Sequence, residues 1–251
     1  MTIDFCLPVR NEESILESNL VKIHDFLITQ NYSFNWQIVV ILNNCDDNSE
    51  KIVGNLVSDY PDKIKYLSVN PPGKSGALKH YFCLSRADIL VFMDIDLAVS
   101  LEDLGALISP ILNDESDLVI GSRLLKNSKV ERSFFRSSSS LIYNFLSRQF
   151  LKHQFHDLQC GFKAFKSTVF LKVQPYLKDD QWFLDTELVI LANFFKFRIK
   201  EIPVNWAENR YAKRTSKINP YKQSLIFIRN LISLRRRLNN LKKIKRHSDN
   251  V

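Results

Sequence analysis

The sequence has 251 residues, 45% apolar and 25% charged, a composition typical of a globular protein and unlike that of a disordered or fibrous chain. Its four cysteines are spread singly, without the spacing of a zinc site or a disulfide framework, so we expect reduced thiols in a cytosolic setting. No signal-peptide pattern and no apolar stretch of about 18 residues is present, which predicts neither secretion nor a membrane span.

Positive charge is concentrated near the C-terminus. The formal net charge is +8, but from Lys213 onward 12 basic residues stand against one acid, whereas the rest of the chain has 23 basic and 26 acidic residues. Apolar residues in this segment recur at spacings of four and three, which predicts an amphipathic helix. This apolar stripe consists of Phe227, Leu231, Leu234, Leu238 and Leu241.

Three interpretations of this basic segment remain open. It is a helix docked on its own body with a solvated basic face, a helix on a membrane surface, or a nucleic-acid-binding arm. The last is the least supported, because the segment has few aromatic residues to stack on bases and no recognisable reading motif.

In the first half of the chain, short β-rich runs alternate with longer helical patterns. Strands are predicted at 3–9, 37–42, 64–69, 89–93 and 118–120, and helices at 12–29, 48–58, 75–85 and 101–112. This alternation indicates βαβ units, so we expect an α/β fold with a mainly parallel sheet flanked by helices. Ligands of such sheets bind beyond the carboxyl ends of the strands, and the residues that follow each strand are therefore the functional candidates.

Two aspartates, Asp94 and Asp96, follow the apolar run at 89–93. Because alternate residues of a strand share one face, their carboxylates are expected to converge. A divalent cation such as Mg²⁺ or Mn²⁺ would relieve the repulsion between them and could bridge the oxygens of a diphosphate. The alternative is a pair of solvated acids in a turn.

Two further motifs have both a functional and a structural interpretation. Gly73 and Lys74 precede a predicted helix and offer amide donors and a cation to an anion, although the earlier glycine of a P-loop is missing; they also fit a plain helix start. Asp185 and Glu187 precede the helical pattern at 188–195. They fit either acid/base or acceptor-positioning groups, or a helix cap and a first-turn acid.

Several segments form a characteristic series along the chain. In the first half they are Leu7-Pro8-Val9-Arg10-Asn11-Glu12-Glu13, Asn43-Asn44-Cys45, Gly73-Lys74-Ser75-Gly76-Ala77-Leu78 and Asp94-Ile95-Asp96-Leu97. In the second half they are Ile120-Gly121-Ser122-Arg123, Asp157-Leu158-Gln159-Cys160-Gly161-Phe162-Lys163, Phe183-Leu184-Asp185-Thr186-Glu187-Leu188 and Lys200-Glu201-Ile202-Pro203-Val204. The segments of the first half resemble the family 2 glycosyltransferases of GT-A fold, and those of the other half are similar to their dolichyl-phosphate glucose and mannose synthase group. The similarity covers about residues 3–235.

The resemblance implies a Rossmann-like GT-A domain at 1–219 and a basic amphipathic helix or tail at 220–251. It implies an inverting, metal-dependent transfer of a hexose from a UDP- or GDP-sugar to a polyprenyl phosphate, by an enzyme bound peripherally to the cytoplasmic face of an anionic membrane through its basic helix. The alternatives are transfer to a glycan or other soluble hydroxyl acceptor, and an inactive scaffold that binds nucleotide sugar. The neutral Asn43-Asn44, in place of two acids of the family, suggests the scaffold.

The resemblance also implies roles for single residues. The donor pocket would be lined by Pro8, Arg10, Glu12, Asn43, Gly73 and Lys74. Asp94 would face the ribose or the water shell of the Mg²⁺ or Mn²⁺ ion, and Asp96 would ligate that ion. The remaining roles are phosphate binding by Arg123 and Arg136, closure over the donor by Lys217, and positioning of the acceptor or sugar by Asp185 or Glu187.

Overall fold

The fold is built on one main sheet with helices on both faces. The structure, a computed structural model, describes residues 1–70, 73–131, 134–207 and 220–248, and within these it describes all side chains except those of 134–140, 220–224 and 245–248. The strands are β1 (Thr2–Val9), β2 (Asn35–Asn43), β3 (Ile64–Val69), β4 (Ile89–Met93), β5 (Leu118–Ser122), β6 (Lys129–Glu131), β7 (Phe162–Lys166), β8 (Ile199–Pro203) and β9 (Asn205–Ala207). The helices are α1 (Glu13–Thr29), α2 (Ser49–Asp59), α3 (Gly73–Leu84), α4 (Leu104–Leu112), α5 (Phe134–Leu151), α6 (Ser167–Val173), α7 (Leu184–Phe194) and α8 (Pro220–Ser248), with short 3₁₀ turns at Leu101–Asp103 and Gln174–Tyr176.

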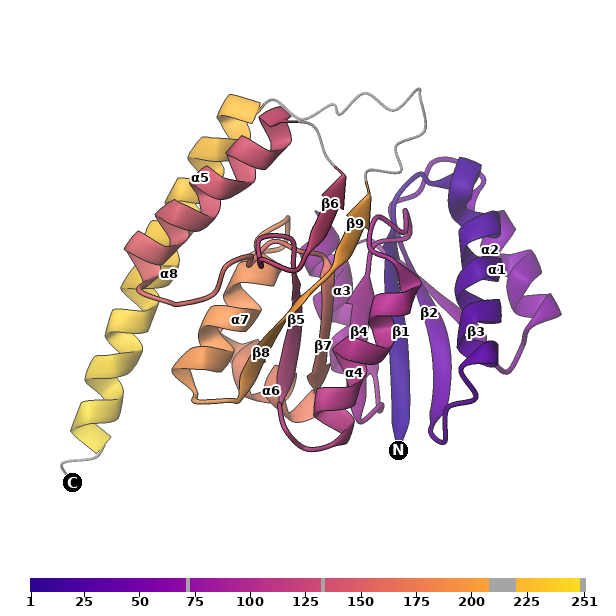
Figure 1. Ribbon diagram of the computed structural model, residues 1–251, viewed down its shortest axis with the longest axis horizontal. Coiled ribbons are helices and arrows are strands. Elements are labelled where there is room, and N and C mark those ends of the chain that lie inside the picture. The colour runs from indigo at the N-terminus through magenta and orange to yellow at the C-terminus, as the bar shows by residue number, and fades with distance from the viewer. Residues whose placement is uncertain (71–72, 132–133, 208–219, 249–251) are drawn as a thin grey trace.

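The main sheet has the strand order β3-β2-β1-β4-β7-β5-β8 (Figure 1). Its neighbouring strands are parallel except at β7, which runs antiparallel to both β4 and β5. The predicted mainly parallel sheet is therefore confirmed, but the reversed strand was not predicted. Because β7 is reversed, its first residues lie beside the last residues of β4, where Phe162 is paired with Met93. Short strands β6 and β9 form a separate parallel pair.

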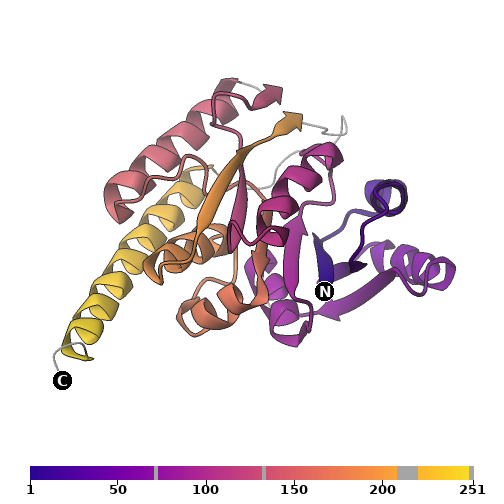
Figure 2. The ribbon, with the colours of Figure 1, turned by 60° about the horizontal axis from the view of Figure 1, so that its bottom comes forward.

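Strand alternation divides the core into two layers. Ile3, Phe5 and Leu7 of β1 face the helices α1, α2 and α4, whereas Cys6 faces the opposite layer, formed by α3, α5, α6, α7 and α8. Figure 2 shows the helices distributed over the two sides of the sheet. Both faces are covered by apolar residues, which explains why the central strands read as nearly continuous apolar runs.

The C-terminal helix packs on the body through the predicted apolar stripe. Leu231 and Leu234 are almost fully buried, and the ring of Phe227 lies 5.2 Å from that of Tyr143 on α5. Helices α5 and α8 lie side by side at one end of the molecule (Figures 1 and 2). The predicted amphipathic helix is confirmed, and its stripe is used for docking on the chain itself. None of the helices within the described ranges is long and apolar enough to span a membrane.

We predict that Leu234→Ala lowers the free energy of unfolding by about 2–5 kcal/mol, because the substitution leaves a cavity beneath α8. Ile232→Ala is the matched control, since Ile232 lies on the same helix but is 36% exposed, and it should cost less than about 1 kcal/mol. Urea unfolding measures both variants. An equal decrease in the free energy of unfolding for both variants would contradict the docked position of α8.

Candidate active site

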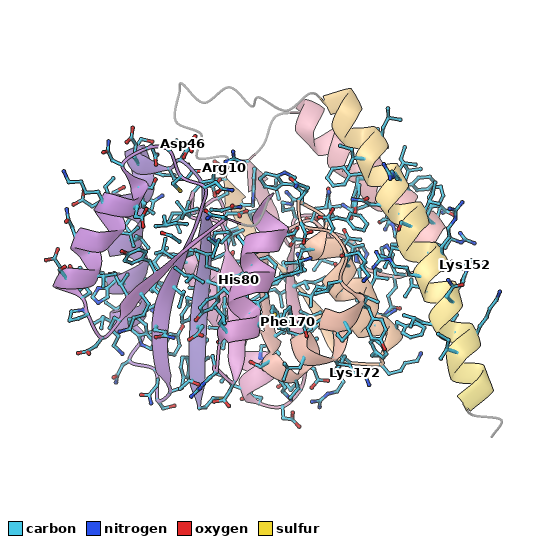
Figure 3. The ribbon with its side chains drawn as sticks, turned by 180° about the vertical axis from the view of Figure 1, so that it is seen from behind. Arg10, Asp46, His80, Lys152, Phe170 and Lys172 are labelled. Carbon is cyan, nitrogen blue, oxygen red and sulfur yellow. The ribbon has the colours of Figure 1, made fainter. Side chains whose placement is uncertain are left out.

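The carboxyl ends of β1, β2 and β4 meet the start of β7 at one edge of the sheet. In Figure 3, Arg10 and Asp46 lie at this edge, and Lys172 lies toward the opposite one. Here β4 ends at Met93, and the chain continues into a turn in which the Leu97 amide donates to the carbonyl of Asp94 at 3.3 Å. Leu97 has φ +52°, a left-handed conformation that is unfavourable for a leucine and is found where the surrounding structure holds a turn tightly.

Within this turn Asp94 and Asp96 have different neighbours. The Lys74 ammonium lies 2.5 Å from Asp94 Oδ1, and Asp96 Oδ1 accepts the amide of Ala98 at 3.1 Å. The expectation from strand alternation does not apply to them, because both residues lie beyond the strand. Burial alone would lower the pKa of Lys74, but the carboxylates of Asp94, Asp185 and Asp96 outweigh that effect and raise it. Lys74 is therefore a fixed cation at the strand ends.

A glycine makes room for this ion pair. A Cβ added to Gly161 would overlap Asp94 Oδ2 and lie 3.2 Å from Lys74 Nζ. Gly161 stands directly before β7, so the reversed direction of β7 brings this residue against the turn after β4. The sequence motif contained Gly161, but we assigned no function to it from the sequence.

A second ion pair lies beside the first. The Lys163 side chain is fully buried, and its ammonium contacts both Asp185 Oδ1 and the carbonyl of Cys160 at 2.5 Å. The ring of Phe92 lies below the two ammonium groups, with its centroid 5.5 Å from Lys163 Nζ and 5.9 Å from Lys74 Nζ. Asp94, Lys74, Lys163 and Asp185 thus form a cluster of alternating charges, and sequence reasoning missed Lys163.

Arg123 is held by a carboxylate that we did not single out from the sequence. Its Nε and Nη2 donate to Asp157 at 2.6 and 2.9 Å, and its backbone amide donates to the same group at 3.1 Å. Asp157 is fully buried. Burial would raise the pKa of Asp157, but the Arg123 guanidinium outweighs it and lowers that pKa below its ordinary value. The structure therefore places Arg123 at the edge of the cluster with its charge already paired.

The two acids of α7 are used in different ways. Residues two apart on a helix do not face each other. Asp185 joins the cluster, whereas Glu187 is 1% exposed and accepts the amides of Lys178 and Asp179, each at 3.0 Å, and a bond from Arg237 of α8. Asp185 thus lies at the strand ends, whereas Glu187 binds the backbone at Lys178 and Asp179 and the side chain of Arg237 on α8.

Two amides in the first turn of α3, where Gly73-Lys74 predicted an anion site, already have backbone partners. The amides of Ser75 and Gly76 donate to the carbonyls of Gln181 and Asp180, at 3.0 and 2.8 Å. Gly73 has φ +75°, and an added Cβ would lie 2.6 Å from the Cα of Gln181. The contribution of this motif to the cluster is thus the Lys74 ammonium.

The other predicted donor residues lie around the ends of β1 and β2. Arg10 is exposed, the amide of Glu12 donates to Ser49 Oγ at 3.2 Å, and Asn43 is buried and accepts a bond from Asn44 at 3.4 Å. Pro8 is the penultimate residue of β1. A cavity of about 220 Å³ opens nearby and is lined by Leu42, Asn44, Cys45, Asp46, Glu50, Ser68, Val69 and Asn70. The side chains of Arg136 and Lys217 lie outside the described residues.

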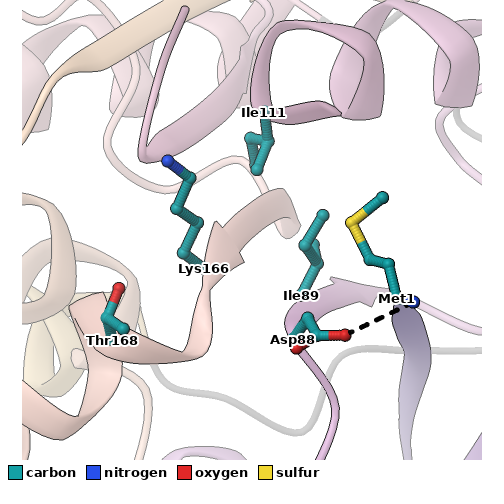
Figure 4. Close-up of a pocket in the computed structure, with 6 residues that line it drawn as sticks. All are labelled: Met1, Asp88, Ile89, Ile111, Lys166 and Thr168. Carbon is teal, nitrogen blue, oxygen red and sulfur yellow. Dashed lines mark ion pairs between the residues drawn. The ribbon is translucent and has the colours of Figure 1, made fainter. Parts of the chain in front are cut away.

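A larger cavity of about 450 Å³ lies at the other edge of the sheet (Figure 4). It is lined by Met1, Asp88, Ile89, Ile111, Lys166 and Thr168. These residues include the start of β1 and β4 and the end of β7, so this cavity is remote from the charged cluster. None of the predicted site residues whose side chains the structure describes lines it.

The charged cluster fits a hydrated divalent cation better than a closed protein cage. Among the described residues, no group of three or more His, Cys, Asp or Glu side chains is arranged to hold a metal ion. Asp94 and Asp96 supply hard oxygen atoms at the strand end, and Mg²⁺ is commonly held by one or two carboxylates together with substrate phosphates and water. The residues present therefore fit an ion that arrives with a diphosphate.

Comparisons with known proteins identify the family and the type of fold. The profile of Glycosyl transferase family 2 matches residues 4–173. The chain belongs to this family. Glucosyl-3-phosphoglycerate synthase of Mycobacterium tuberculosis, crystallised with Mn²⁺, UDP and glucosyl-3-phosphoglycerate, superposes with a TM-score of 0.61 at 18% identity, over 93% of this chain and 78% of that one. The likeness confirms the GT-A type of fold that the sequence predicted.

Similarity to curated family 2 members extends across most of the chain. The chain is 33% identical over 205 residues to glycosyltransferase AglD of Haloferax volcanii, and the match covers 81% of this chain and 33% of AglD. Identity to the dolichyl-phosphate beta-glucosyltransferase of Saccharomyces cerevisiae is 30% over 247 residues, covering 89% of this chain and 72% of that protein. Identity to the Homo sapiens enzyme of the same name is 31% over 186 residues, covering 70% of this chain and 57% of that protein. The chain thus spans a third of AglD and little more than half of the human relative.

We predict that Asp157→Asn in this family 2 protein lowers the free energy of unfolding by about 3–5 kcal/mol at neutral pH, because it leaves the Arg123 charge without a partner. The folded-state pKa of Asp157 is depressed, so its contribution is present above the unfolded pKa and is lost as the pH falls through the folded value. Urea unfolding at pH values from 7 downward measures the difference in the free energy of unfolding between wild type and variant. This difference should narrow only below about pH 4.

The control is Glu115→Gln, which removes the partner of Lys200 in an exposed pair at 3.3 Å and should change stability little. If the difference in the free energy of unfolding between wild type and Asp157→Asn stays constant into strong acid, the assigned ion pair is contradicted.

Proposed function

We propose that this chain transfers a hexose from a nucleotide sugar to a polyprenyl phosphate, with inversion at the anomeric carbon. The observation that carries the proposal is the identity to dolichyl-phosphate beta-glucosyltransferases over most of the chain. The cluster at the strand ends supports it, because it offers carboxylate and ammonium groups at the edge of the sheet where ligands of such folds bind. UDP-glucose is the first donor to test.

In this reaction an oxygen of the acceptor phosphate attacks the anomeric carbon of the donor sugar. The new carbon–oxygen bond forms as the bond to the diphosphate breaks, and its electron pair leaves with the nucleoside diphosphate. A phosphomonoester has a second pKa of about 6, so the acceptor is already largely an anion at neutral pH and needs no general base. The main task of the protein is to stabilise the leaving group.

Residues of the cluster divide that task. The Lys74 ammonium, fixed by Asp94, would face the diphosphate as it gains charge, and Asp185, held by Lys163, would accept hydrogen bonds from sugar hydroxyls. Asp96, with Asp94 beside it, would hold Mg²⁺ or Mn²⁺, which would supply electrostatic stabilisation of the diphosphate. Arg123, oriented by its bond to Asp157, remains a proposed phosphate contact from the sequence, as do Arg136 and, for closure over the donor, Lys217.

We predict that lipid-linked product forms from UDP-glucose and a short polyprenyl phosphate only with a divalent cation, and that Asp96→Asn lowers the rate by about 100-fold or more, as loss of a preorganised electrostatic contact does. Chromatographic separation of the radiolabelled lipid product measures it. Asp62→Asn is the control, because Asp62 is an exposed acid before the start of β3, away from the cluster and from the predicted donor residues.

Three results would contradict the assignment in different ways. Donor binding without any lipid product would favour the soluble-acceptor alternative, which the fold shared with glucosyl-3-phosphoglycerate synthase also allows. Binding without turnover of any donor would favour the inactive scaffold. Full activity of Asp96→Asn would remove Asp96 from the metal site.

We also propose peripheral attachment to the cytoplasmic face of an anionic membrane, through the exposed side of α5 and α8. Because the stripe of α8 is used for docking on the body, the lipid surface would contact its other side. That side carries five exposed residues at spacings of four, three, four and seven, namely Leu225, Arg229, Ile232, Arg236 and Lys243. On α5, the large apolar residues Leu141, Ile142 and Phe145 are 51–61% exposed. An apolar surface beside cations fits anionic lipid.

We predict that the triple replacement of Arg229, Arg236 and Lys243 by Gln weakens binding to anionic vesicles by on the order of 100-fold, since each cation near such a surface contributes about 1 kcal/mol. Co-sedimentation with phosphatidylserine vesicles measures the loss. The control replaces the exposed Lys22, Lys51 and Lys65, on the α1, α2 and β3 side of the molecule, by Gln. Equal losses in both triples would indicate attraction by net charge alone.

A further inference from the structure

Helix α8 reaches toward the charged cluster through two polar side chains on its inner side. The Arg237 guanidinium donates to Glu187 Oε1 and, at 2.5 Å, to the carbonyl of Tyr176. Two turns earlier, Asn230 Nδ2 donates to Asp179 Oδ2 at 3.2 Å. A spacing of seven residues puts both side chains on one face of the helix, so they act on the same segment.

That segment, residues 176–183, is here termed the strap. Its conformation is set by the same two carboxylates that α8 binds. Glu187 Oε2 accepts the amides of Lys178 and Asp179, and Asp179 Oδ1 accepts those of Gln181 and Phe183, at 2.9 and 2.7 Å. Each carboxylate therefore has one oxygen on the strap backbone and the other on α8. A displacement of α8 would remove the partner of a buried charge, which is a costly change.

The strap in turn holds the elements that carry Lys74 and Asp185. Its carbonyls at Asp180 and Gln181 accept the amides of Gly76 and Ser75 in α3, and Ser75 Oγ accepts the amide of Leu184 at 3.2 Å. Asp180 also pairs with Lys79 one turn further along α3, at 2.5 Å. The strap leads directly into α7, whose second residue is Asp185. Lys74 and Asp185 are thus positioned by one segment, and α8 fixes that segment.

We propose that Arg237 and Asn230 are positioning residues for the donor site: docked on the body, α8 holds the strap so that the Lys74 ammonium and the Asp185 carboxylate are placed to bind a nucleoside diphosphate sugar with its divalent cation. The proposal rests on the proposed function for the identity of the ligand. It makes α8 part of the active-site framework in addition to its lipid-facing side. Loss of the bond between Arg237 and Glu187 therefore weakens donor binding even where no membrane is present.

The experiment compares Arg237→Met, Arg237→Lys and Lys242→Met with the wild-type chain in solution, without lipid. Lys242 is an exposed cation on the same helix, so Lys242→Met removes the same charge without touching the strap. Calorimetric titration with UDP and Mn²⁺ should show binding roughly 10-fold weaker for Arg237→Met, the size expected for one charged hydrogen bond, and unchanged for Lys242→Met. Arg237→Lys, which keeps a cation opposite Glu187, should recover most of the affinity.

Hydrogen exchange gives a second readout that does not depend on the ligand. The amides of Ser75, Gly76, Lys178 and Asp179 should exchange faster in Arg237→Met than in Lys242→Met. If Arg237→Met does not fold, Asn230→Ala removes the other bond from a half-buried position and should weaken UDP binding in the same direction. Wild-type affinity in Arg237→Met, or an equal loss in Arg237→Lys, would overturn the proposal. A wild-type chain that binds neither UDP nor, in the same titration, GDP would instead refute the proposed function, and unchanged amide exchange would then refute the positioning role of α8 by itself.

Discussion

The buried ammonium of Lys163 is the constraint on which the site depends. A charge removed from water is tolerated only with a close partner, and Lys163 meets this need with Asp185, the Cys160 carbonyl and the Phe92 ring. Asp185 lies on α7, Cys160 lies just before β7, and Phe92 lies on β4. The pair therefore holds three elements together at the strand ends. Burial of one charge thereby orients Asp185 toward the cluster.

Two more buried charges follow the same rule. Asp157, before β7, is paired with Arg123 after β5, and Glu187 of α7 is paired with Arg237 of α8. Each pair joins segments that are 34 to 50 residues apart in the sequence. The apolar layers hold the sheet and helices together without specifying how the loops at its edge lie. The ion pairs supply that specificity, since a shifted loop would leave a buried charge unpaired.

The elements of the first half could be predicted because strand and helix periods are local properties of the sequence. The direction of β7 could not be predicted, since the pattern Phe162–Lys166 fits a strand of either direction and β7 lies between two helices in the chain, without a hairpin to a neighbouring strand. Lys163 and Asp157 were missed for the same reason: each owes its environment to partners distant in sequence. Asp185 and Glu187 were equivalent in the sequence, and only the packing of α7 separates them. The amphipathic stripe predicted a helix correctly but could not reveal whether protein or lipid covers it.

The cluster also explains how two carboxylates are tolerated in one turn. Asp94 and Asp96 would repel each other after β4, but the Lys74 ammonium beside Asp94 offsets that repulsion. A divalent cation that arrives with a diphosphate brings nearly compensating charges, so its entry changes the balance of the cluster little. In the proposed transfer, breaking the bond to the sugar would leave additional negative charge on the diphosphate, and the Lys74 ammonium would then stabilise the leaving group. Under the proposed function, one lysine would thus contribute both to the stability of the turn and to turnover.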